Sequence, residues 1–310
     1  MEQAGNLARH VGNLHRNLPA RQSAIGALLI LTSAVTAIAL AWMLRLVAGT
    51  PFLVLAGAAG PAALYAAIIW WMQRREGRPS ALLAACFLWG AASAAFLSQA
   101  TNDLARVWVG MLAGTDDARA LTATWVAPLI EEAAKAAGLI LLVALRPCLL
   151  RNVRDGVVYG ALVGVGFLFT ENLTYLRLAV LQGGGSGFGR GVYLRGLLAG
   201  ANHAIFTATI GAGLGWARSA PFGRARRLAP ILAGAAACLQ HVAWNGVASG
   251  AIAGALCGAE VPGGACRATP APGDLFVVVP ALTLAFLAPG GGTLLYLAAR
   301  RRARCGGSAE

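Results

Sequence analysis

Two adjacent carboxylates and a lysine lie at the centre of an apolar segment of the chain. The stretch VAPLIEEAAKAAGLILLV contains Glu131, Glu132 and, one turn later, Lys135, the only lysine of the protein. In a helix, Glu131 and Lys135 share a face, and Glu132 lies about 100° around the axis. We therefore expect Lys135 to neutralise Glu131, leaving Glu132 free to react. Pro128 is expected to free backbone carbonyls just before the pair.

Three later apolar segments each carry one further group that could do chemistry. These groups are Glu171, His203 and His241, and each has a second residue four positions away on the same helical face. At 1.5 Å per residue, Glu131 and these three groups all lie roughly 15–17 Å below one membrane boundary. The partners at helical spacing are Phe167 before Glu171, Thr207 after His203 and Asn245 after His241.

Carboxylates and imidazoles at one depth suit hydrolysis. Glu171, His203 and His241 match the ligand types of a catalytic zinc with an open position for water, and Asn172 and Asn245 are candidates to support those ligands. A metal-free mechanism fits the same residues: Glu132 activates water while the histidines donate hydrogen bonds to an oxyanion. A buried ion-pair network that only fixes helix register is the structural alternative.

The composition predicts a polytopic helical membrane protein. Hydrophobic residues make up 58% of the 310 residues and charged residues 12%, too few charges to cover a soluble domain. Apolar runs of about 20 residues can cross the hydrocarbon core, where helices satisfy their own backbone. The last run contains Pro289 and three glycines, which predicts a kink or a partial crossing. The eight runs cover 24–46, 52–73, 81–99, 120–145, 156–182, 193–217, 228–252 and 275–299.

Arginine clusters occur in every second connection between these runs. The net charge of +13 would suggest nucleic acid in a soluble protein, but this alternation is the positive-inside pattern, with both termini cytoplasmic. We therefore expect a lipid bilayer and no nucleic acid as partner. The predicted parts are a tail (1–23), three accessory helices (24–99), an outer loop (100–119), a four-helix catalytic core (120–252), a second outer loop (253–274), a last span (275–299) and a basic tail (300–310).

Two of the six cysteines share the second outer loop. Cys257 and Cys266 form a disulfide if the outer compartment is oxidising and their Cβ atoms approach, and otherwise they are two free thiols. The glycines Gly156, Gly160 and Gly164 form a GxxxGxxxG row, which is typical of close helix packing in membranes.

Four motifs in this order resemble the PrsW family of intramembrane proteases: EEAAK at 131–135, FLFTEN at 167–172, NHAIFTATIGAGLG at 202–215 and HVAWN at 241–245. The resemblance covers about 125–246, and it extends to the wider group that includes CAAX prenyl endopeptidases and bacterial immunity-type proteins. The prenyl endopeptidase branch has a histidine where this chain has Glu171, which favours the PrsW branch. The resemblance implies an active site of Glu131, Glu132, Glu171, His203 and His241, supported by Lys135, Phe167, Asn172 and Asn245.

The resemblance also implies a partner and a location. The substrate would be a single-pass membrane protein, such as an anti-sigma factor, cleaved near the outer face of a bacterial inner or plasma membrane. The family is called a metalloprotease, which implies zinc. Two other classes place ionisable residues at mid-membrane: a proton- or cation-coupled transporter, which usually shows matched halves, and a non-catalytic membrane scaffold. The polar residues here are concentrated in 120–252 without matched halves.

Overall fold

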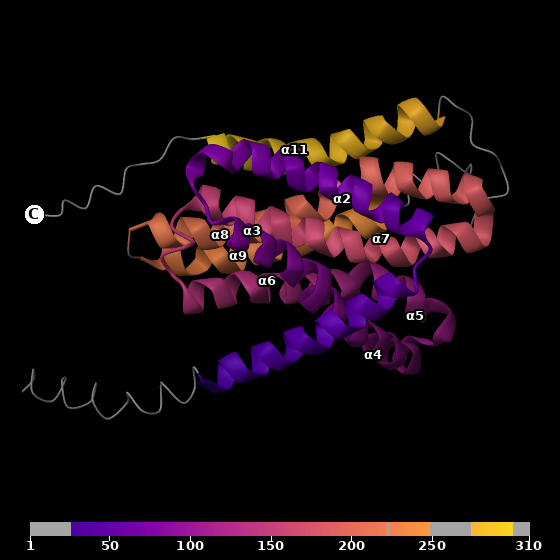
Figure 1. Cartoon of the computed structure of the whole chain (residues 1–310), viewed down its shortest axis with the longest axis horizontal. Helices are drawn as coiled ribbons and strands as arrows, with labels where there is room; N and C mark the ends of the chain where they lie inside the picture. The colour runs from indigo at the N-terminus through magenta and orange to yellow at the C-terminus, as the bar shows by residue number, and fades with distance from the viewer. Residues whose placement is uncertain (1–25, 222, 249–273, 300–310) are drawn as a thin grey trace, which may run out of the picture.

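Helices form all the regular structure in the part of the chain that the structure describes. The computed structural model describes residues 26–221, 223–248 and 274–299, which contain no strand. The helices lie along one long axis as a bundle (Figure 1). The predicted all-helical class is therefore confirmed. The tails at 1–23 and 300–310 and the loop with Cys257 and Cys266 lie outside the described residues.

The chain is a multi-pass membrane protein. Six helical stretches among the described residues are long and apolar enough to cross a membrane. The helix Ala127–Leu145 is not one of them, because it carries Glu131, Glu132 and Lys135. The stretch Val153–Ser219 counts as one, although its backbone leaves the helical conformation at Gly184 (φ 57°, ψ −143°).

The elements follow one another with short connections. A first helix spans Gly26–Ala48. It is followed by α2 (Phe52–Gln73), η1 (Arg74–Glu76), α3 (Ser80–Leu88), η2 (Trp89–Ala94), α4 (Ala95–Ala113), α5 (Thr115–Leu121), η3 (Thr122–Val126), α6 (Ala127–Leu145), α7 (Val153–Gly191), η4 (Val192–Leu198), α8 (Ala201–Ser219), α9 (Arg224–Ala243), η5 (Trp244–Ala248), η6 (Asp274–Val278) and α11 (Val279–Ala299).

The glycine row of α7 packs directly on the backbone of α8. A Cβ atom on Gly156 would lie 1.8 Å from the carbonyl oxygen of Gly211, and one on Gly164 would lie 2.1 Å from that of His203. A Cβ on Gly160 would likewise lie 2.4 Å from the carbonyl oxygen of Thr207. Only glycine allows this approach. The predicted packing role of the row is confirmed, and the row fixes the height of His203 against α7.

A buried ion pair holds one end of the bundle. Arg78 donates from Nε and Nη2 to Oδ1 of Asp155, at 3.0 and 2.8 Å, and both side chains are almost fully buried. Arg151 donates to the other carboxylate oxygen, and Asn152 caps the N-terminus of α7 by accepting from the backbone N–H of Asp155. These contacts join the start of α3 to the start of α7, so both helices leave from a common anchor.

One stretch differs from the expectation. The segment 100–119, expected as an outer loop, is helical: α4 continues to Ala113, and α5 follows after Gly114 (φ +89°). The polar residues of α4 lie on one helical face and its apolar residues on the other, so charge there does not mark a loop. The last helix, α11, contains Pro289, and its predicted kink or partial crossing stays a prediction.

Candidate active site

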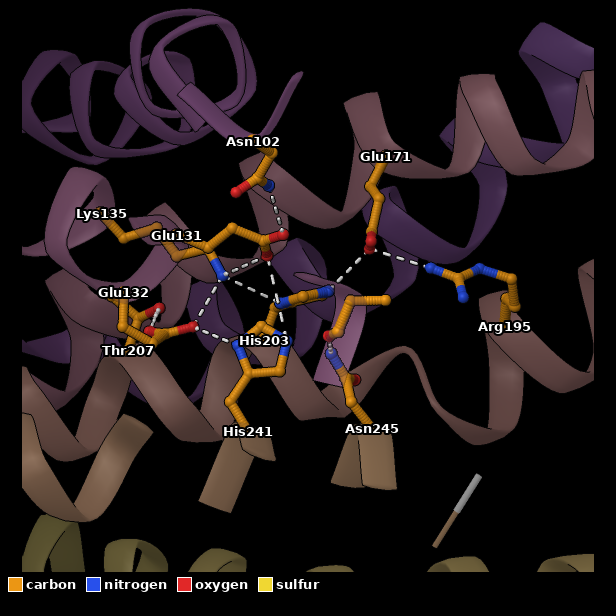
Figure 2. Close-up of polar contacts among 11 residues, drawn as sticks. Asn102, Glu131, Glu132, Lys135, Glu171, Arg195, His203, Thr207, His241 and Asn245 are labelled. Carbon is orange, nitrogen blue, oxygen red and sulfur yellow. Dashed lines mark hydrogen bonds and ion pairs between the residues drawn. The ribbon is translucent and has the colours of Figure 1, made fainter. Parts of the chain in front are cut away.

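The helix α6 presents the carboxylates and the lysine from its first turns. Pro128 lies in the first turn of α6, directly after the π-helical segment η3. Glu131, Glu132 and Lys135 are 8%, 1% and 0% exposed, so all three project into the bundle rather than into lipid. Figure 2 shows them converging with side chains from α7, α8 and α9.

Lys135 connects three acceptors. Its Nζ lies 2.7 Å from Oε1 of Glu132, 3.0 Å from Nδ1 of His203 and 3.7 Å from Oε2 of Glu131. It also lies 3.8 Å from the centroid of the Phe167 ring, a cation–π contact. Lys135 therefore pairs with Glu131, as expected, but makes its shorter contact with Glu132. Helical spacing did not decide this, since residues three and four positions away are both within reach.

Glu132 is fully engaged as a buried anchor. Oε1 accepts from Lys135 and lies 3.1 Å from Nδ1 of His241, and Oε2 accepts from the hydroxyl of Thr207 at 3.1 Å. Because a carboxylate only accepts, the His241 Nδ1 carries the hydrogen and donates. The other nitrogen of His241, Nε2, then keeps its lone pair and lies 3.9 Å from Oε2 of Glu131.

His203 is held from both sides of its ring. The Lys135 ammonium can only donate, so Nδ1 of His203 accepts from it. The Nε2 nitrogen then donates to Oε2 of Glu171 at 2.7 Å. The same carboxylate oxygen lies 2.9 Å from Nη2 of Arg195, whose guanidinium stacks on the Tyr175 ring at 3.6 Å. Figure 2 shows Glu171 and Arg195 on one side of the His203 ring and Lys135 on the other.

A cavity of about 520 Å³ reaches part of this network. Glu131, Glu171, His203 and His241 line it, whereas Glu132 and Lys135 lie behind them. Asn102 of α4 lines it too and donates from Nδ2 to Oε1 of Glu131 at 3.3 Å. The carboxylate of the pair that lines the cavity is therefore Glu131, whereas Glu132, expected to be the reacting group, is buried behind it.

The predicted supporting residues have different surroundings. Phe167 is buried, with its ring centroid 5.2 Å from that of His203. Asn245 lines the cavity and donates to the backbone carbonyl of Ala123 at 2.9 Å, which ties η5 to η3. Asn172 is buried, and neither polar atom of its amide has a hydrogen-bond partner among the described residues. Neither asparagine supports a histidine directly.

Two residues of the network were not predicted from the sequence. Asn102 lay in the segment expected to be a loop, and Arg195 lay at the edge of an apolar run among scattered arginines. A signal for Arg195 was present, because a charged residue inside an apolar segment usually has a buried partner. No comparable signal marked Asn102, whose role depends on α4 folding back over α6.

The residues that could hold a metal are Glu131, His203 and His241. One ligand atom from each lies within 4.8 Å of the others, and all three residues are buried. Two further observations fit a metal: Oε2 of Glu131 is buried without a hydrogen-bond donor, and Nε2 of His241 keeps its lone pair. The sequence prediction placed Glu171 in this set; in the structure Glu171 contacts both His203 and Arg195.

A helical membrane bundle with carboxylates and imidazoles around an internal cavity is the arrangement expected of an intramembrane hydrolase. Residues 78–269, more than half of the chain, match the PrsW family intramembrane metalloprotease, and the chain belongs to this family. It is therefore an intramembrane endopeptidase. Neither the curated proteins nor the solved structures gave a match.

The different surroundings of the two adjacent glutamates predict different defects. Glu131→Gln removes the cavity carboxylate but keeps its shape, so the protein should accumulate normally while proteolysis falls by roughly 10²–10⁴-fold. Glu132→Gln leaves Lys135 without its closest partner and should also destabilise the fold, by about 3 kcal/mol. Thermal unfolding in detergent and substrate cleavage measure the two effects separately. Normal stability of Glu132→Gln together with unfolding of Glu131→Gln would contradict this division.

Proposed function

We propose that the chain cleaves membrane-protein substrates at a zinc centre held by Glu131, His203 and His241. The observation that carries the proposal is the buried Oε2 of Glu131, which lacks a hydrogen-bond donor and lies 3.9 Å from the free Nε2 of His241. A set of one oxygen and two nitrogen ligands suits zinc and leaves a coordination position for water. Burying ionisable groups in a membrane costs free energy, so such groups usually belong to a functional site.

The surrounding residues orient the ligands. Glu132 accepts from Nδ1 of His241 and so directs Nε2 toward Glu131, an arrangement typical of histidine ligands in metal sites. Asn102 restrains the Glu131 carboxylate through Oε1. Zinc, when bound, supplies a Lewis acid that lowers the pKa of a coordinated water to about 7. Glu171 also lines the cavity and engages its partners through Oε2, so Oε1 is available to take a proton from water.

The size of the cavity bears on the form of the substrate. A helix with side chains is about 10–12 Å across, too wide for a cavity of about 520 Å³ to enclose more than a short piece of it. We infer that a single-pass membrane protein, such as an anti-sigma factor, presents a locally unwound segment to the site. The polar wall that α4 contributes with Gln99, Asn102 and Asp103 would satisfy the exposed backbone of such a segment.

We also propose eight crossings with both termini cytoplasmic, in a bacterial plasma membrane. The alternation of arginine clusters supports this arrangement. Two of the crossings would come from α6 and from dividing Val153–Ser219 at Gly184. The glutamate pair and histidine motifs further support a place in the wider group of CAAX prenyl endopeptidases and immunity-type proteins.

The proposed activity predicts a specific change in the membrane proteome. Cells with the wild-type protein should contain amino-terminal or carboxy-terminal fragments of at least one single-pass membrane protein that are absent in a Glu131→Gln strain. Quantitative proteomics of isolated membranes measures these fragments, with equal amounts of both proteins as the control. Identical fragment patterns in the two strains would remove the assignment of Glu131 as a catalytic group.

The zinc proposal predicts that activity and metal content change together. The purified protein should bind about one zinc per chain, lose cleavage activity on treatment with a chelator and regain it when zinc is added. Elemental analysis and cleavage of a fragment-yielding substrate give the two readouts. Full activity in chelator-treated protein without metal would reject the zinc centre and leave Glu131 acting on water directly.

The proposed topology predicts the side of each connection. Reporters fused after Arg75 and after Arg304 should read cytoplasmic, and one after Asp117 should read external. An external reading at Arg304, with the other two as expected, would show that the segment 275–299 does not cross.

A further inference from the structure

Arg195 is a charged residue that the fold holds beside the candidate active site. It lies in the π-helical segment η4, which packs on α2: a Cβ on Gly196 would lie 2.7 Å from Pro61, and one on Gly200 would lie 2.5 Å from the Tyr65 ring. The Tyr65 hydroxyl also donates to the backbone carbonyl of Leu197. The backbone that follows Arg195 is therefore held against α2 by tertiary contacts.

The guanidinium is fixed as well as the backbone. It stacks on Tyr175 with 3.6 Å between Cζ and the ring centroid, a geometry in which the planar group keeps its orientation. From there Nη2 reaches Oε2 of Glu171 at 2.9 Å. Tyr175 and Glu171 are one turn apart on α7, so a single helical face presents both the stacking surface and the carboxylate.

The same oxygen of Glu171 is the acceptor for His203. Oε2 of Glu171 accepts from both Nη2 of Arg195 and Nε2 of His203. The guanidinium therefore helps to fix the location of the oxygen to which the imidazole donates. An acceptor at Nε2 places the hydrogen on that nitrogen and leaves the lone pair of His203 on Nδ1. In this structure that lone pair accepts from Lys135, so a metal would bind Nδ1 in place of the ammonium. Figure 2 shows this chain of contacts from Arg195 through Glu171 to the ring of His203.

We propose that Arg195 is a positioning residue that acts through Glu171 to orient His203 for metal binding. This inference rests on the proposed zinc centre and adds to it a group that lines the cavity and acts on the ligand His203 only through Glu171. Without the guanidinium, the Glu171 carboxylate would keep His203 as its only donor among these groups and could rotate away from it. Groups that orient histidine ligands in this way typically change metal affinity by roughly 10–100-fold when removed.

The test measures zinc affinity of the full-length protein in detergent by competition with a chelator of known affinity. Arg195→Gln should bind zinc roughly 10–100-fold more weakly than the wild type, and Arg195→Lys, which keeps the charge, should recover part of the loss. Arg177→Gln is the matched control, because it removes the same charge from an exposed position on α7 and should leave the affinity unchanged. Size-exclusion chromatography confirms that each variant is folded.

A double-variant comparison separates positioning from a general effect on charge. If Arg195 acts through Glu171, the variant with Arg195→Gln and Glu171→Gln should bind zinc no more weakly than Glu171→Gln alone. Additive losses would overturn the inference, as would wild-type affinity in Arg195→Gln. If Arg195→Gln does not fold, Tyr175→Leu is tested instead. Loss of the ring on which the guanidinium stacks should also weaken zinc binding.

The outcome for the wild-type protein distinguishes the two proposals. Failure of the wild type to bind zinc would overturn the proposed metal centre, and the inference on Arg195 with it. Zinc binding by the wild type with no change in Arg195→Gln would overturn only the inference.

Discussion

The direct backbone contact between α7 and α8 is the constraint on which the site depends. Gly156, Gly160 and Gly164 let the two helices approach until a Cβ at any of them would overlap a carbonyl of α8. At this distance the rotation and height of α8 are fixed, which brings His203 within 2.7 Å of Glu171. The same contact places Thr207 against Glu132. A larger residue in the row would push α8 away from α7, and His203 and Thr207 would move with it.

The second constraint is the cost of charge within a membrane. Each ionisable group of the network contacts a group of complementary charge or a hydrogen-bond partner on another helix, so the charges also serve to join α6, α7, α8 and α9. Lys135 is central, because one ammonium contacts Glu132 and His203 and lies near Glu131. A cation at this point neutralises the carboxylates without filling the cavity, which leaves Glu131 as the one carboxylate of the pair that a substrate or metal can reach.

The network therefore divides into two layers with different tasks. Glu132 and Lys135 lie in the buried layer and hold the helices together, and Glu131, Glu171, His203 and His241 face the cavity. One wall of the cavity comes from outside the predicted core of 120–252, since α4 contributes Asn102, and η4 within the core contributes Arg195. These segments connect the catalytic helices to the rest of the bundle, so the accessory helices participate in shaping the site rather than only in crossing the bilayer.

The sequence by itself determined the membrane class, the family and most of the residues that meet at the site. It could do so because charges inside apolar runs are costly, and because helical spacing assigns residues to faces. Only the tertiary structure decided which glutamate faces the cavity, since Lys135 can reach a residue three or four positions away and the choice depends on His241 and Thr207. It likewise decided which carboxylate lies beside which histidine: Glu171 contacts His203, and Oε2 of Glu131 lies 3.9 Å from Nε2 of His241. Contacts between helices far apart in sequence fix these choices, and no local pattern encodes them.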